Sequence, residues 1–132
     1  MRLVTQLENQ GCLRACLAMI AGVEYADVPE HCGWSYNDAL GWLRQRGIES
    51  KPMLTNATPR EGSVYIVCSP SLNLMTSLHA MVWDCRLPQS VLLDPNSGRE
   101  GKKAYPSPEY LMRINQWRLD YEVLLPAASV QS

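Results

Sequence analysis

The stretch from Gln6 to Gly22, QLENQGCLRACLAMIAG, passes from a polar, turn-like run into an apolar helix at a cysteine. We expect this helix to run from about Cys12 to Ala21 and to stop at Gly22, because glycine accepts the left-handed conformation that ends many helices. A cysteine at the helix start suits a nucleophile, since the unpaired N–H groups and the positive end of the helix dipole favour a thiolate. The stretch would also suit two buried core thiols, so the choice between a nucleophile and a core residue depends on the rest of the chain.

Composition and charge narrow the class of protein. The 132 residues, 46% of them hydrophobic, suit one compact domain with a modest core. We expect that domain to span residues 1–125, with residues 126–132 as a frayed tail. The net charge of −1 gives no reason to expect a nucleic-acid or membrane partner. The five cysteines form an odd set without a secretory signal, which argues against a disulfide framework and favours a cytoplasmic location.

The order of sequence periods predicts an α+β fold, with two helices followed by a mostly antiparallel sheet. The second helix is expected from the cap at Ser35 to Gly47, and a late helix begins at Ser107-Pro108-Glu109. The predicted strands cover residues 48–54, 64–68, 78–85, 91–94 and 119–125, and Pro52 places the first of them at a sheet edge.

A thiolate nucleophile needs a base, and the hairpin formed by residues 78–94 offers one. If Asp84 faces Gln89, then His79 faces Asp94; if the register is shifted so that Cys85 faces Ser90, His79 and Asp94 are diagonal neighbours. Either register, with a turn centred on Leu87-Pro88, puts both side chains on one face of the sheet. Asp84 points to the other face and is a poor partner for His79, whereas Asn96 has the correct parity and is a reserve candidate.

Acyl transfer at Cys12 also needs donors for an oxyanion. The backbone N–H of Cys12 is one such donor. Gln6, six residues upstream, carries an amide that we expect to point to the space beside Cys12, and Gln10 is the other candidate.

These residues resemble the bacteriocin-processing, double-glycine-leader cysteine peptidases of the papain-like superfamily. The resemblance rests on Gln6, on Cys12 opening the helix CLRACLAMI, and on His79 followed fifteen residues later by Asp94-Pro95. The resemblance covers roughly residues 1–95. The chains that this protein resembles are compact, stand-alone members of bacterial or phage type. The resemblance implies a papain-like fold with N-terminal helices packed on a small antiparallel sheet. It also implies a cysteine peptidase acting on a peptide or protein substrate, with Cys12 as nucleophile, His79 as base, Asp94 as its orienting partner and Gln6 as oxyanion donor.

One departure from that family leaves a second function open. The family usually has glycine directly after the nucleophile, and here Leu13 stands there. Leu13 favours the alternative that the site has decayed and that the protein is a binding or inhibitor module on the same scaffold.

We expect no cofactor and no metal site. A zinc site is disfavoured by the spacing of its candidate ligands, which are Cys12, Cys16, His31 and Cys32. Cys16 is expected to be a core thiol.

Overall fold

The computed structural model describes residues 1–114 and 116–125 as helices on both sides of one antiparallel sheet. The helices are α1 (Cys12–Ala21), α2 (Tyr36–Gln45) and α3 (Pro108–Arg113), and two short 3-10 turns (Tyr25–Asp27, Glu30–Gly33) lie between α1 and α2. The strands are β1 (Ser50–Thr55), β2 (Val64–Pro70), β3 (Leu78–Asp84), β4 (Val91–Leu93) and β5 (Arg118–Val123). The predicted α+β class is therefore confirmed. None of the helices in these residues is long and apolar enough to cross a membrane.

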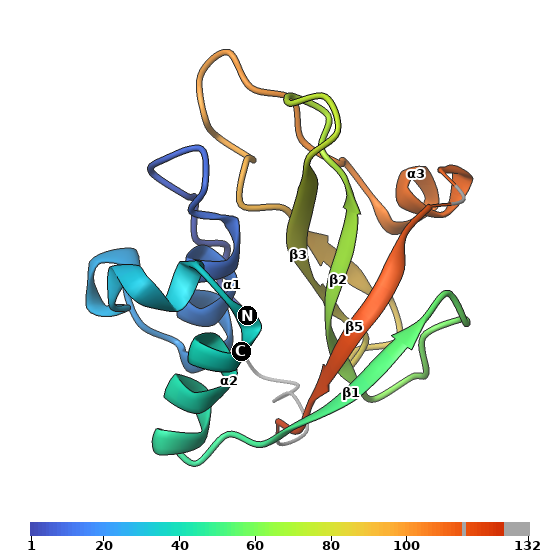
Figure 1. Cartoon of the computed structure of the whole chain (residues 1–132). Coiled ribbons are helices and arrows are strands. Elements are labelled where there is room, and N and C mark those ends of the chain that lie inside the picture. The colour runs from blue at the N-terminus through green and yellow to red at the C-terminus, as the bar shows by residue number, and fades with distance from the viewer. Residues whose placement is uncertain (115, 126–132) are drawn as a thin grey trace.

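The strand order of the sheet is β1-β5-β2-β3-β4, and all four neighbouring pairs are antiparallel. The C-terminal strand β5 lies between β1 and β2 (Figure 1). β1 lies at one edge, as Pro52 predicts, and β4 lies at the other. Apart from Pro52, local sequence patterns carry no information on this order, because it is set by contacts between distant segments.

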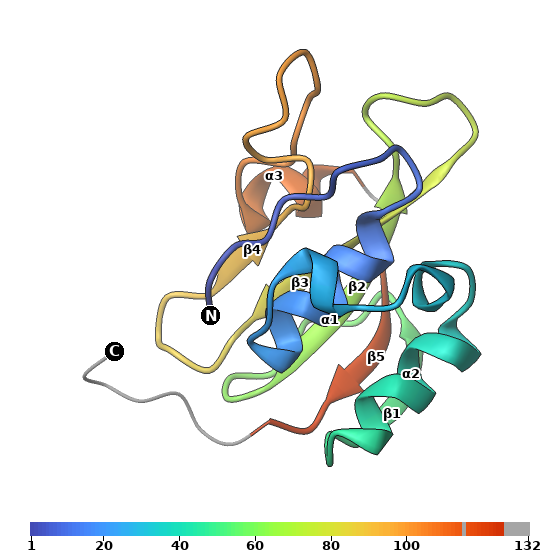
Figure 2. The ribbon, with the colours of Figure 1, turned by 90° about the vertical axis from the view of Figure 1, so that its left-hand side faces the viewer.

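Two hydrophobic cores lie on the two faces of the sheet, and β2 supplies side chains to both. Val64 and Ile66 pack with α1 and α2, whereas Tyr65 and Val67 pack with Leu111 of α3. Figure 1 shows α1 and α2 on one side of the sheet and α3 on the other, and in Figure 2 α1 and α2 lie in front of the strands. A strand covered on both faces is continuously apolar, which is why β2 could be recognised from its sequence.

Helix α1 has the predicted bounds because its end signals are local. Gly22 follows the last turn with a φ of 72°, and its N–H bonds back to Ala18. The buried residues of α1 lie on nearly all sides of the helix and are Leu13, Ala15, Cys16, Leu17, Ala18, Met19 and Ile20. Cys16 is thus a core thiol, as expected. Cys12, at the first position, is only partly buried and packs at the margin of this core.

Other element boundaries differ from prediction by a few residues. Helix α2 starts after the Ser35 cap but ends at Gln45, and the left-handed Gly47 (φ 79°) lies in the connection to β1. β2 extends to Pro70, two residues beyond the expected end. α3 is capped by Ser107, whose hydroxyl accepts from Tyr110 N–H. The predicted tail at 126–132 lies outside the described residues.

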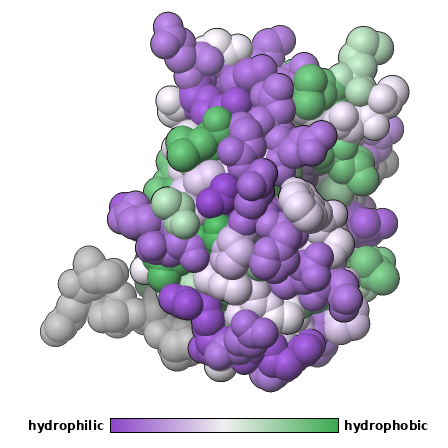
Figure 3. Space-filling model, turned by 60° about the vertical axis from the view of Figure 1, so that its left-hand side comes forward, coloured by the Kyte–Doolittle hydropathy of each residue, from purple (hydrophilic) through white to green (hydrophobic). Residues whose placement is uncertain are grey.

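The face in Figure 3 is largely hydrophilic, with hydrophobic side chains scattered over it.

Candidate active site

Cys12 is held where the N-terminal end of α1 meets the open part of β3. β4 pairs with β3 only at residues 82–84, so the backbone of β3 at residues 78–80 has no strand on that side. The N–H of Ala80 points to the Cys12 sulfur instead and hydrogen bonds to it, as does the N–H of Leu13. The first intrahelical bond runs from Ala15 N to Gly11 O, so the N–H of Cys12 precedes the helical ladder and is available to a ligand.

The turn before Cys12 depends on a close approach between Gly11 and Tyr25. A Cβ at position 11 would lie 2.2 Å from the Tyr25 hydroxyl oxygen, so only glycine fits there. The Tyr25 hydroxyl donates to Glu8, and Arg14 stacks over the Tyr25 ring at 4.3 Å while it pairs with Glu8 at 3.4 Å. These contacts fix the loop that sets the position of Cys12, and no local sequence signal marks them.

The β3–β4 hairpin adopts one of the two registers left open by the sequence. Asp84 faces Val91 and Val82 faces Leu93, which is the register that makes His79 and Asp94 diagonal neighbours. The two side chains meet: Nε2 of His79 lies 2.6 Å from Oδ1 of Asp94, and both residues are buried. Asp84 pairs with Arg86 at 2.9 Å.

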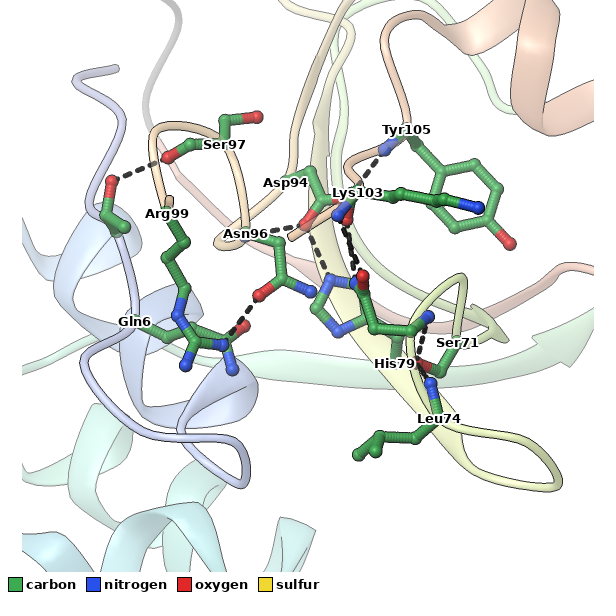
Figure 4. Close-up of polar contacts among 12 residues, drawn as sticks. Gln6, Ser71, Leu74, His79, Asp94, Asn96, Ser97, Arg99, Lys103 and Tyr105 are labelled. Carbon is green, nitrogen blue, oxygen red and sulfur yellow. Dashed lines mark hydrogen bonds and ion pairs between the residues drawn. The ribbon is translucent and has the colours of Figure 1, made fainter. Parts of the chain in front are cut away.

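Asp94 is positioned by two backbone donors as well as by His79. The N–H of Asn96 donates to Oδ1 at 2.8 Å, and the N–H of Tyr105 donates to Oδ2 at 2.7 Å (Figure 4). Its carboxylate is 1% exposed, so these bonds replace its hydration. The side chain of Asn96, the reserve candidate, accepts from Arg99 at 2.9 Å instead. Since Asp94 takes Nε2 of His79, Nδ1 is the ring nitrogen left to face Cys12.

The two ionisable groups shift each other's protonation in opposite directions. Burial opposes the imidazolium form of His79, but hydrogen bonds to Asp94 and to Cys12 outweigh it and raise the pKa of His79 to about 9. Burial also opposes the Cys12 thiolate, but the His79 hydrogen bond and the Ala80 and Leu13 N–H groups outweigh it, and the pKa of Cys12 is lowered. Together the two shifts favour the thiolate–imidazolium pair over the neutral thiol and imidazole, and the thiolate is the reactive form of a cysteine.

The other four cysteines have the opposite chemistry. Burial raises the pKa of Cys16 and of Cys32, and it raises the pKa of Cys68 and of Cys85 to about 11. Cys12 is the only one of the five thiols whose pKa is lowered. The structure thus separates one activated thiol from four inert ones.

Gln6 is buried at 2% exposure beside the segment that follows Asp94, and its backbone N–H bonds to Pro95 O at 2.9 Å. Its Nε2 donates to Glu8 O at 2.8 Å and, through a long contact of 3.4 Å, to Asn9 O. Its Oε1 is buried without a hydrogen-bond partner among the described residues. The amide is therefore turned toward the loop 8–9, and its role as an oxyanion donor stays a prediction. Gln10 is exposed.

Arg99 connects the two loops that carry the candidate residues. Its guanidinium donates to Asn96 Oδ1 at 2.9 Å and to Asn9 Oδ1 at 3.2 Å, joining the segment after Asp94 to the turn before Cys12. Figure 4 shows Arg99 and Gln6 on the same side of Asn96. From sequence, the basic loop 99–103 is expected to be a solvated connection rather than a nucleic-acid patch, and the structure shows a loop in which Arg99 is half-buried. No local signal marks a contact across ninety residues.

A groove of about 220 Å³ opens directly in front of Cys12 and His79. Its walls come from the segment before α2, from β3 and from β5, and its lining residues are Cys12, Leu13, Trp34, Ser35, Tyr36, Cys68, Leu78, His79, Ala80, Arg118 and Asp120. A larger recess on another part of the surface lies between the β3–β4 turn and Ser107 and carries none of the candidate residues. A substrate placed in the groove at Cys12 would touch both members of the ion pair.

The zinc ligands considered from sequence do not form a site. His31 contacts Cys32 at 3.8 Å, but no group of three or more His, Cys, Asp or Glu side chains in residues 1–114 and 116–125 is arranged to hold a metal ion.

Comparison of the chain with protein-family models and with curated proteins found no match. A functional assignment therefore rests on the geometry at Cys12, His79 and Asp94.

Proposed function

We propose that the protein is a thiol hydrolase of papain-like architecture that cleaves a peptide or related acyl bond with Cys12, His79 and Asp94. The observation that supports this most strongly is the three-residue chain at the groove: a helix-start thiol beside an imidazole whose far nitrogen lies 2.6 Å from a buried carboxylate. Nucleophile, base and orienting group are the three parts that covalent acyl transfer requires. The order of helices and strands also agrees with the papain-like scaffold that the sequence resemblance implies.

In this proposal the Cys12 thiolate attacks the carbonyl carbon of the substrate, and the carbonyl oxygen becomes an oxyanion. The backbone N–H of Cys12 stabilises that oxygen, and Gln6 can add a second donor if its long contact to Asn9 O is exchanged for the oxyanion. His79 gives its proton to the leaving amine, and a thioester remains on Cys12. A water molecule then attacks the thioester as His79 accepts its proton, which releases the acid and restores the thiolate. Asp94 keeps the ring of His79 oriented and its charge balanced throughout.

Leu13 is compatible with this chemistry in the structure. Its side chain is 8% exposed and belongs to the helix core, while its backbone N–H points to the Cys12 sulfur. Leu13 also lines the groove, so it narrows the space near the scissile bond. A binding or inhibitor module is favoured by one observation, which is that both hydrogens of the Gln6 amide already have acceptors.

A peptide library prepared from a digested proteome tests the proposal. The wild-type protein should generate new peptide termini with a common sequence pattern, and the Cys12→Ala variant should generate none. Capture of library peptides by the wild-type protein without any cleavage would instead support the binding module. Because Cys12→Ala removes only a small, partly buried side chain, it should keep the fold, which a thermal melt would check.

A further inference from the structure

The groove contains a charged cluster that the chemistry at Cys12 does not use. Asp120 is fully buried and accepts from the Tyr36 hydroxyl at 2.6 Å and from Nε of Arg118 at 2.5 Å. The side chain of Arg118 is 49% exposed, and all three residues line the groove in front of Cys12. The carboxylate is thus hidden beneath the surface, whereas its cationic partner faces the groove.

A β-bulge in β5 produces this arrangement. Ile66 pairs with Tyr121 and Val67 pairs with Leu119, so Asp120 is an additional residue in β5. The bulge lets Asp120 turn to the α2 side, where Tyr36 lies, and bulges commonly re-aim a side chain beside a site. An acidic residue in a strand centre, 0% exposed, is costly unless it is paired. Here Asp120 is paired with Arg118, whose Nε it holds, and the bond from Tyr36 orients its carboxylate.

The guanidinium end of the Arg118 side chain has hydrogen-bond donors that Asp120 does not use. Its only hydrogen bond within residues 1–114 and 116–125 uses Nε, so the terminal nitrogens Nη1 and Nη2 are not engaged there. A guanidinium held through Nε presents its terminal N–H groups as a fork, which matches a carboxylate in a two-bond geometry. Because Asp120 is buried and satisfied, it offers no oxygen to a ligand in the groove.

The sheet register places this fork within reach of the reaction centre. Arg118 pairs with Cys68, and Cys68 pairs with Ala80, whose N–H bonds to the Cys12 sulfur. Two strand spacings separate Arg118 from Ala80, which is about 10 Å, or the length of about three extended residues. An extended segment bound at Cys12 would therefore bring a group one to three residues away to Arg118.

We propose that Arg118, positioned by Asp120 and Tyr36, is a specificity residue that binds a carboxylate of the substrate one to three residues from the bond attacked by Cys12. The carboxylate is an acidic side chain or the free C-terminus of the substrate chain. This inference rests on the proposed function, since it takes Cys12 to be the reacting group. The exposed Trp34 and Leu78 on the groove walls supply apolar contact for the rest of that segment.

Electrophilic peptides test the inference. Chloroacetyl peptides and peptide chloromethyl ketones, which enter the groove in opposite directions, should carry glutamate at the first, second or third residue from the electrophile. Matched probes carry glutamine, and the chloroacetyl peptides are made with either an amidated or a free C-terminus. Mass spectrometry then gives the rate of Cys12 labelling by each. We expect at least one carboxylate probe to label Cys12 about tenfold faster than its neutral counterpart, as a charge-assisted hydrogen bond would allow.

The preferred probe identifies the source of the carboxylate: the glutamate amides report an acidic side chain and the glutamine acids report a C-terminus. In Arg118→Gln the ratio of carboxylate to neutral labelling should fall to about one. The double variant Arg118→Gln/Asp120→Asn, which leaves no buried unpaired carboxylate, should show the same loss and serves if the single variant is unstable. Arg60→Gln is the matched control, because Arg60 pairs with Glu122 of the same strand and lies outside the groove, so it should keep the wild-type ratio.

Two results would overturn the inference: equal labelling by all carboxylate and neutral probes in the wild-type protein, or a preference that Arg118→Gln leaves unchanged. Failure of the proposed function gives a different pattern, because the neutral probes would then not select Cys12 over the other four cysteines.

Discussion

Replacing Asp94 with asparagine should uncouple the thiolate from its base. Asp94→Asn keeps the shape of the side chain but removes the negative charge that lies 2.6 Å from Nε2 of His79. The pKa of His79 should fall from about 9 toward or below its ordinary value of 6.5, because burial then acts with less opposition. Cys12 loses its cationic neighbour, and its pKa should rise toward 9.0 or above.

The size of the effect follows from these values. A change from 9 to 6.5 corresponds to about 3–4 kcal/mol, or about a 300-fold loss of thiolate below neutral pH. A thiolate of higher pKa is intrinsically more nucleophilic, with a Brønsted coefficient of about 0.4–0.5. The two effects together leave about a twentyfold decrease in the alkylation rate of Cys12 at pH 6.

The assay is the pH dependence of Cys12 alkylation by iodoacetamide, followed by peptide mass spectrometry. The wild-type rate should reach its plateau at a pH below the ordinary range of cysteine, and in Asp94→Asn the plateau should move to higher pH. Asp84→Asn is the matched control, because it removes a carboxylate from the same hairpin that pairs with Arg86 and does not contact His79. An Asp94→Asn protein that is folded by circular dichroism yet labels at the wild-type rate at pH 6 would refute the triad.

Three further substitutions test the supports of the site. Gly11→Ala should lower the free energy of unfolding by about 1–3 kcal/mol in chemical denaturation, because its Cβ would lie 2.2 Å from the Tyr25 hydroxyl. Combining Gly11→Ala with Tyr25→Phe should restore most of the lost stability. If the double variant is no more stable, the clash is not the cause. Gln6→Ala should lower the free energy of unfolding by about 1–3 kcal/mol, because the hydrogen bond to Glu8 O is lost. If Gln6 also binds the oxyanion, the rate of peptide cleavage should fall about 100- to 1000-fold, whereas the rate of alkylation, which forms no oxyanion, should change little. Cys16→Ala should leave the alkylation rate of Cys12 within about twofold, since Cys16 is fully buried and its thiol is kept protonated; a larger change would show that the two thiols titrate together.

The parts of the site that could be predicted from sequence are those with local signals. The bounds of α1 follow from the cysteine and the glycine at its two ends, and both occur as expected. The shared face of His79 and Asp94 follows from counting residues around one turn, because a strand alternates its side chains with a period of two. The structure then selects the register, which the sequence leaves open.

The parts that could not be predicted depend on contacts between distant segments. The insertion of β5 between β1 and β2 brings Arg118 and Asp120 to the groove, and Tyr36 reaches them from α2, eighty-four residues away from Asp120. The bulge at Asp120 has no mark in the sequence LDYEV. The close approach of the Tyr25 hydroxyl to Gly11 could not be predicted either, because glycine is common in turns and only the folded chain shows which side chain lies against it.

Competitive alkylation of all five cysteines tests whether Cys12 is a thiolate activated by His79. The native protein is treated with limiting iodoacetamide at pH 6, quenched, unfolded and mapped by mass spectrometry, alongside His79→Ala. We expect labelling confined to Cys12, with a rate that falls about tenfold or more in His79→Ala while the other four thiols stay unreactive in both proteins. Uniform slow labelling of the five thiols, or labelling of Cys12 that is the same without His79, would contradict it.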